Sequence, residues 1–167
     1  MFTSWSCTDP DCCQYIRNDG NKYEMIQAVW LDTTEEDREK GLYEYCIVRI
    51  EIDLDDYSDE KKLGYISSYG YTLENIVEEY GDGADGIIAE CIMEDESLSD
   101  TYVIDDADSF DEAEAKIEKI IKEEEQWKKR IEKAIKYIET LLQIYDMNVS
   151  IDDQDLCHII EILKGRE

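Results

Sequence analysis

The sequence predicts an α+β protein, with a small antiparallel sheet of about four strands and short helices, then a long helix and a C-terminal helix. Apolar and polar residues alternate within residues 23–54, apolar residues recur every three or four positions over 117–145, and turn and capping residues separate the segments. At 167 residues with 43% hydrophobic content, the chain can bury roughly 70% of its unfolded surface in a core. These observations favour a folded protein.

Two strands are expected first, over residues 23–31 and 43–54. The acidic loop between them, DTTEEDREKG, has Gly41 at its end and suits a long hairpin. The second strand ends in an alternation of apolar and acidic residues, in the order Ile50, Glu51, Ile52, Asp53, Leu54 and Asp55. Such a strand buries one face and presents carboxylates on the other.

Short helices should follow the second strand. Ser58 is expected to cap one that runs to Tyr69, and Thr72 to cap LENIVEEY, which Gly81 ends. After the turn-rich GDGADG, residues 87–93 and 101–104 are expected to form a second hairpin around EDESLSD. Ala, Glu and Met leave a helix open as the alternative for 87–93. The two short helices would then cover the inner face of a four-stranded sheet.

A capping box, Ser109 to Glu112, marks the start of a long helix expected from Phe110 to Tyr145. Its apolar seam has one polar member and consists of Ile117, Ile120, Glu124, Trp127, Ile131, Ala134, Ile138, Leu141 and Tyr145. A bend within KEEEQWKKR is the alternative to a continuous helix. Ser150 should open a last helix that folds back as a hairpin, unless the seam over 113–145 joins two copies in a homodimer.

The negative charge is concentrated in one part of the chain. The whole chain carries −27, of which residues 1–115, with 7 basic and 32 acidic residues, carry −25, and residues 116–167 carry −2. We therefore expect an acidic α+β domain over 1–108 and a helical hairpin or coiled-coil-like region over 109–167. This charge disfavours direct binding to nucleic acid or anionic membranes and favours a basic protein surface as the partner.

The N-terminus shows no basic segment followed by an apolar run, and no stretch of 18 apolar residues occurs. Neither a secretory signal nor a membrane span is expected. Six cysteines without such a signal predict reduced thiols in the cytoplasm.

A zinc site would have to use residues from both ends of the chain. The weak candidates are Cys7, Cys12, Cys13, Cys157 and His158. Their spacing lacks the repeated CxxC pairs of structural zinc sites, so no cofactor is expected, with zinc as the less favoured alternative.

Catalysis has little support in the sequence. The sole histidine has no evident nucleophile partner, and GDGADG lacks the lysine of a phosphate-binding loop. Carboxylate pairs are too abundant for any one pair to indicate an acid and a base. The sequence predicts a protein that is not an enzyme.

Acids on ordered elements, interleaved with tyrosines, form the candidate binding surface instead. Its members are Glu51, Asp53, Asp55, Asp56, Tyr57, Asp59, Glu60, Glu78, Glu79, Asp82, Asp85, Glu94, Asp95 and Glu96. Tyrosines beside carboxylates supply rigid contact area with a polar tip, which suits an interface. The alternative is that charge on an outer strand only deters aggregation.

In size, charge and Tyr-rich acidic surface, residues 23–112 resemble small acidic DNA-mimic inhibitors of the phage and mobile-element kind, the anti-restriction and anti-CRISPR proteins. The resemblance implies a protein that occupies the basic groove of a nucleic-acid-binding effector and excludes DNA or RNA. Two alternatives remain: an acidic adaptor or immunity-type module that masks a basic partner without mimicry, and a regulator that binds metal through its cysteines.

Overall fold

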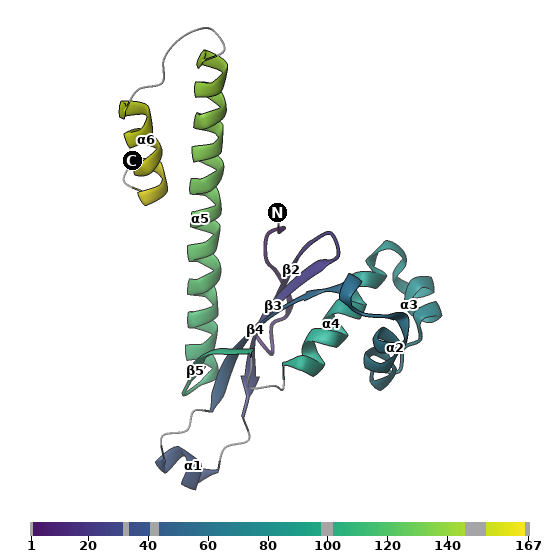
Figure 1. Ribbon diagram of the computed structural model, residues 1–167. Helices are drawn as coiled ribbons and strands as arrows, with labels where there is room; N and C mark the ends of the chain where they lie inside the picture. The colour runs from purple at the N-terminus through teal and green to yellow at the C-terminus, as the bar shows by residue number, and fades with distance from the viewer. Residues whose placement is uncertain (1, 32–33, 41–43, 98–101, 146–152, 166–167) are drawn as a thin grey trace. The chain divides into compact units, whose positions relative to one another are not determined.

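The computed structural model describes residues 2–31, 34–40, 44–97, 102–145 and 153–165 (Figure 1). The chain divides into two compact units, Met1–Glu118 and Lys119–Glu167. Unit 1 contains an antiparallel sheet with helices, and the described residues of unit 2 are almost entirely helical. The predicted α+β class is confirmed.

In the described residues the sheet has five strands in the order β1-β2-β3-β4-β5, and every neighbouring pair is antiparallel. The strands are β1 Ser6–Asp9, β2 Gln14–Asp19, β3 Lys22–Trp30, β4 Tyr45–Asp53 and β5 Val103–Ala107. The two strands expected first are confirmed as β3 and β4, which pair from Lys22 opposite Asp53 to Trp30 opposite Tyr45. The loop between them contains a short helix, α1 Glu35–Glu39.

Strands β1 and β2 were not predicted from the sequence. Their sequences, SCTD and QYIRND, are short and mostly polar, so they lack the alternation that identifies β3 and β4. Between them the chain turns through Cys13, which has a φ of 47°. A left-handed residue other than glycine is uncommon. Two local hydrogen bonds help to hold this turn, from the Cys13 N–H to the Pro10 carbonyl at 3.3 Å and from the Asp11 N–H to the Asp9 carboxylate at 2.9 Å.

The two predicted short helices are confirmed as α2 Asp59–Ser68 and α3 Leu73–Tyr80. Their caps form as expected, because the hydroxyls of Ser58 and Thr72 accept backbone N–H groups three residues ahead. Gly81 ends α3 with a φ of 55°, a conformation that glycine adopts without steric cost.

The prediction of a strand over 87–93 was wrong, since these residues lie inside helix α4, Ala84–Glu96. The helix is buried around much of its circumference, and six of its residues are core residues. Such an apolar run has no clear period, so periodicity cannot separate a buried helix from a buried strand. The helix begins inside GDGADG, where a 3₁₀ turn, Gly81–Gly83, precedes it.

The second predicted hairpin was therefore also wrong. The strand expected at 101–104 is present as β5, but it pairs with β4 and runs from Val103 to Ala107. Residues 98–101, which include Thr101 and part of the expected loop, lie outside the described residues.

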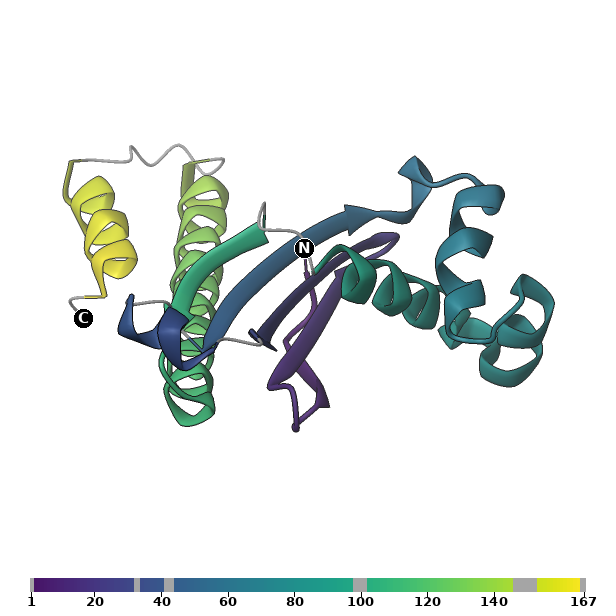
Figure 2. The ribbon, with the colours of Figure 1, turned by 90° about the horizontal axis from the view of Figure 1, so that it is seen from below.

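One core lies between the sheet and the short helices. Helix α4 lies against β3 and β4, and α2 and α3 pack on α4 (Figures 1 and 2). Met25 and Ile50 of the sheet, Ile66 of α2, Ile76 of α3 and Ile92 of α4 are all fully buried. The expectation that α2 and α3 cover the sheet directly is corrected: α4 takes that place.

The opposite face of the sheet is covered by the first turns of a long helix, α5 Phe110–Tyr145. Ile26 and Ile47 on this face are fully buried, as are Ala113 and Ile117 of the helix. The ring of Phe110 packs edge-on against Tyr45, with centroids 6.0 Å apart. The centre of the sheet is therefore buried on both faces, like the central layer of a three-layer unit.

A carboxylate is buried within this second face. Glu24 on β3 is 3% exposed and lies between two guanidinium groups. Arg17 on β2 donates to it from Nε at 2.7 Å, and Arg49 on β4 donates to its other oxygen. The Arg17 guanidinium also stacks on the ring of Trp5, 4.2 Å from its centroid. Two of the few cationic side chains of unit 1 thus link strands β2, β3 and β4 through one carboxylate.

In unit 2 the long helix continues without the predicted alternative bend, and the expected helix from Phe110 to Tyr145 is confirmed. Its 36 residues extend about 54 Å at 1.5 Å per residue. The C-terminal helix, α6 Asp153–Lys164, folds back on it (Figure 1). Tyr137 donates to Asp155 at 2.9 Å and packs on the His158 ring. The helical hairpin is confirmed; Ser150 lies outside the described residues.

Glu24→Gln should lower the free energy of unfolding by about 3 kcal/mol, because it leaves two guanidinium groups beside a neutral amide. Urea denaturation of the full chain measures the change. Glu51→Gln is the matched control, since Glu51 stands opposite Glu24 on β4 but is exposed. The control should change stability by no more than about 0.5 kcal/mol. Equal effects of the two variants would contradict a structural role for the Glu24 network.

Candidate functional site

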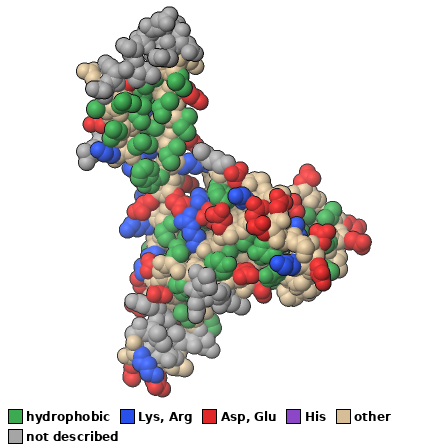
Figure 3. All heavy atoms as spheres, in the orientation of Figure 1, with side chains coloured by type: hydrophobic (Ala, Val, Ile, Leu, Met, Phe, Trp, Pro, Cys, Tyr) green, Lys and Arg blue, Asp and Glu red, His purple; other side chains and the backbone are tan. Residues whose placement is uncertain are grey.

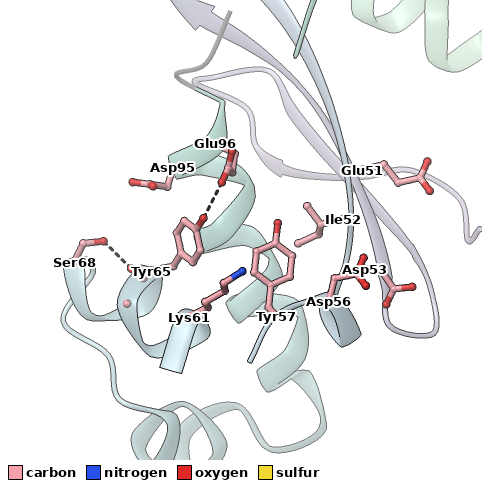
Figure 4. A pocket seen from close by; sticks show the side chains of 11 residues that line it. Glu51, Ile52, Asp53, Asp56, Tyr57, Lys61, Tyr65, Ser68, Asp95 and Glu96 are labelled. Atoms are coloured by element: carbon pink, nitrogen blue, oxygen red, sulfur yellow. Dashed lines mark hydrogen bonds between the residues drawn. The ribbon is translucent and has the colours of Figure 1, made fainter. Parts of the chain in front are cut away.

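A hollow of about 710 Å³ lies on the surface of unit 1, where β4, α2 and the end of α4 meet (Figure 4). It is lined by Glu51, Ile52, Asp53, Asp56, Tyr57, Lys61, Gly64, Tyr65, Ser68, Asp95 and Glu96. We call this feature the acidic hollow. It has five carboxylates in its lining against one ammonium group, so the net charge of its lining is strongly negative.

The turn after β4 fixes one wall of the acidic hollow. Leu54 is 2% exposed and anchors a 3₁₀ turn, Leu54–Asp56, in the core. The Asp53 carboxylate caps this turn by accepting the N–H of Asp55 at 3.1 Å. Asp55 in turn accepts an N–H from the side chain of Asn21 at 3.0 Å. The backbone that carries these acids is therefore held in place before any partner binds.

Two tyrosines stand in the middle of the acidic hollow. The rings of Tyr57 and Tyr65 meet edge to face, with centroids 6.1 Å apart, and Lys61 lies beside them (Figure 4). The hydroxyl of Tyr65 donates to Glu96 at 2.7 Å. This hydrogen bond is the main reason that the pKa of Tyr65 rises to about 12, with burial second. For Tyr57, burial is the main cause of a raised pKa, and the nearby Glu96 carboxylate adds to it.

The end of α4 adds negative charge where a helix tolerates it least. Asp95 and Glu96 occupy the last turn of α4, which has no basic residue. The carbonyl groups at a helix C-terminus already carry partial negative charge, so two carboxylates there oppose the macrodipole. A cation placed in the acidic hollow would interact favourably with both.

The acidic hollow can bind cationic groups but offers little for covalent chemistry. Its one hydroxyl besides the tyrosines, that of Ser68, donates to the backbone carbonyl of Tyr65 at 2.7 Å. His158 lies in unit 2, where its ring packs on Tyr137 with centroids 4.6 Å apart. A guanidinium or ammonium group, by contrast, would find both carboxylates and aromatic faces.

The structure brings six of the predicted partner-binding residues to the acidic hollow, from two distant parts of the sequence. These six are Glu51, Asp53, Asp56, Tyr57, Asp95 and Glu96. Sequence reasoning missed Lys61, Gly64, Tyr65 and Ser68 of α2. Their spacing of three and four positions along an expected helix was the available signal, because it puts them on one helix face.

The other predicted residues lie elsewhere on unit 1. Asp59 and Glu60 are in the first turn of α2, and Glu78 and Glu79 are exposed on α3. Asp82 borders a separate hollow of about 300 Å³.

Two further predicted acids interact with other parts of unit 1. Burial raises the pKa of the Tyr23 hydroxyl, and the nearby Asp85 carboxylate raises it further. Glu94 accepts an N–H from the buried Gln14 at 3.3 Å. Acidic side chains are nevertheless spread over the viewed face of unit 1 (Figure 3).

The cysteines show no arrangement typical of a metal site. Within the described residues, no group of three or more His, Cys, Asp and Glu side chains is placed to hold a metal ion. Cys13 is buried, and burial raises the pKa of its thiol to about 12, which disfavours the thiolate that zinc requires. Cys7 and Cys12 are exposed in unit 1, and Cys157 is exposed in unit 2. Metal analysis of the purified protein would test the zinc alternative.

Comparison with known proteins adds no relative: no protein-family model, no curated protein and no solved structure matches this chain. In the described part of the chain, no helix is long and apolar enough to cross a membrane.

Tyr65→Phe should lower the free energy of unfolding by about 1 kcal/mol at neutral pH, because it removes the hydrogen bond to Glu96. The folded-state pKa of about 12 lies above the ordinary value of 10. The stabilisation is therefore fully present below pH 10 and is lost as the pH rises from 10 to 12. Urea denaturation of both proteins over this range measures the difference. A difference that stays constant through pH 12 would contradict the assignment.

Proposed function

We propose that this protein is an acidic nucleic-acid mimic that binds the basic groove of a nucleic-acid-binding effector, such as a restriction enzyme or a CRISPR nuclease, and blocks DNA or RNA access. The observation that carries the proposal is the acidic hollow, whose lining combines five acidic residues from three separate elements with a tyrosine pair. A groove that binds nucleic acid presents Arg and Lys to neutralise phosphates. Fixed carboxylates can satisfy the same donors.

The rigidity of the acidic hollow supports this role. The Asp53 carboxylate accepts a hydrogen bond from the Asp55 N–H, and the Glu96 carboxylate accepts one from the Tyr65 hydroxyl. Binding to acids already ordered on a sheet and two helices avoids part of the entropic cost of association. Tyr57 and Tyr65 would add contact area for the stems of arginine or lysine side chains, and their faces would attract the cationic heads.

The net negative charge of unit 1 also supports the proposed mimic role. Residues 1–115 carry −25, and this field accelerates encounters with a basic surface and repels free nucleic acid. The protein would act without a cofactor and without catalysis of its own. A cytoplasmic location, where its six cysteines stay reduced and effectors of this kind act, completes the proposal.

Asp56→Lys combined with Asp95→Lys tests the proposal, because both acids line the acidic hollow and are exposed. The immobilised full chain should capture a basic nucleic-acid-binding protein from lysate of its source cell. The double variant should bind that captured protein at least tenfold more weakly. Dissociation constants measured at increasing salt should rise for the unmodified chain and rise less for the variant.

Glu118→Lys combined with Glu139→Lys is the matched control, since it makes the same change in net charge at exposed positions of α5. The control should retain most of the affinity. Duplex DNA or RNA should then displace the protein from its captured partner. If nucleic acid does not compete, the mimic proposal is wrong and the adaptor alternative explains the binding. If both double variants bind alike, the acidic hollow is not the binding surface.

A further inference from the structure

Within the described residues of unit 2, helices α5 and α6 present one exposed apolar face. On α5, Trp127, Ile131, Ile135, Ile138 and Leu142 are 40–54% exposed. They follow one another at steps of four, four, three and four, which places them in a single stripe along the helix. Two other apolar residues of the helix, Ala134 and Leu141, are 4% and 7% exposed. The covered and uncovered residues thus form adjoining stripes.

Helix α6 continues this uncovered face. Its Ile162 is 3% exposed, whereas Leu156 and Ile160, one turn apart, are 53% and 47% exposed. In the space-filling view, hydrophobic side chains gather over both helices of the hairpin, with charged side chains mainly at the margins (Figure 3). A helical hairpin with an apolar face across both helices is half of a four-helix bundle.

The geometry points to a second copy of this chain as the occupant: we propose that the protein is a homodimer in which two α5–α6 hairpins pack face to face as a four-helix bundle. The proposal is independent of the proposed function, because it involves unit 2 alone. It also differs from the predicted seam, since it uses Ile135, Leu142 and two residues of α6 in place of Ile117, Ala134 and Leu141.

The exposed area is of the size that a dimer needs. The seven uncovered side chains, at about half exposure each, present on the order of 600 Å² per copy, if a large side chain has roughly 150–250 Å² in total. A stable interface buries about 800 Å² per partner, including its polar rim. Contiguous apolar patches above a few hundred Å² mark interaction sites in soluble proteins.

Charge permits self-association at this face and opposes it on unit 1. Residues 116–167 carry a net −2 from interspersed acids and bases, so two hairpins approach with little repulsion. Two copies of the part that carries −25 would repel strongly. The near-neutral charge also gives this face no reason to attract the basic partner that the acidic unit favours.

The spacing of the stripe is compatible with twofold symmetry. Read in either direction, the pattern on α5 is nearly the same, so an antiparallel copy can set Trp127 opposite Leu142 and Ile131 opposite Ile138. An isologous interface requires such a self-complementary patch. A dimer of this form would carry two acidic hollows, which would raise its avidity for a partner that has two basic sites.

Sedimentation equilibrium of the full chain tests the proposal directly. The chain should sediment at twice its 19.6 kDa monomer mass over a wide range of protein concentration. Ile131→Glu combined with Ile138→Glu should return the mass to that of the monomer, because both side chains would place a buried charge at the centre of the bundle. A chain that stays monomeric at every concentration would overturn the proposal.

Lys129→Gln combined with Lys136→Gln is the matched control. It makes the same change in net charge two residues earlier along α5, on the opposite side of the helix, where both lysines are exposed. The control should remain dimeric. Far-ultraviolet circular dichroism should show equal helix content in both variants, because the mutated residues are already half exposed in the monomer. A dimer that survives the double glutamate variant would place the interface elsewhere and overturn the proposal.

Discussion

The fold of unit 1 depends on one buried ionic contact, in which Arg17 and Arg49 hold the carboxylate of Glu24 between three strands. The many acidic side chains of unit 1 repel one another, which destabilises its folded state. Its few cationic side chains therefore stabilise the fold most where they contact a buried acid. Two guanidinium groups around one buried acid neutralise it, satisfy its oxygens and fix the register of β2, β3 and β4. This leaves the surface free to remain acidic without a large loss of stability.

Cationic side chains are also scarce in the acidic hollow. Its lining contains five acidic residues and one cationic residue, Lys61, and the last turn of α4 has two acids and no basic residue. Acidic residues at a helix C-terminus oppose the macrodipole and reduce stability a little. The hydrogen bond from Tyr65 to Glu96 orders one acid of the hollow, and the capping contact of Asp53 orders another. The Glu24 network is thus distinct from the charged residues of the acidic hollow, which we propose as the binding surface.

Sequence reasoning predicted well wherever a local signal determines the structure. Apolar–acidic alternation located β4, the Ser58 and Thr72 caps located α2 and α3, and the spacing of three and four gave α5 from Phe110 to Tyr145. It was wrong where the signal was not local. The apolar run at 87–93 has no clear period because α4 is buried on most of its surface, and β1 and β2 have too few apolar residues to show alternation. Part of the acidic hollow was predicted from the charged residues of the strand and the turn.

The sequence by itself determined the charge distribution, the face of β4 that Ile50 and Ile52 bury, and the length of the long helix, because each follows from residue type and spacing alone. Only the tertiary structure decided that Asp95 and Glu96 line the same hollow as Asp56 and Tyr57, since α4 has to fold back across the sheet to bring them there. It also decided which apolar residues of α5 are covered by α6 and which remain exposed. Such contacts depend on the packing of elements far apart in the chain, and no local pattern encodes them.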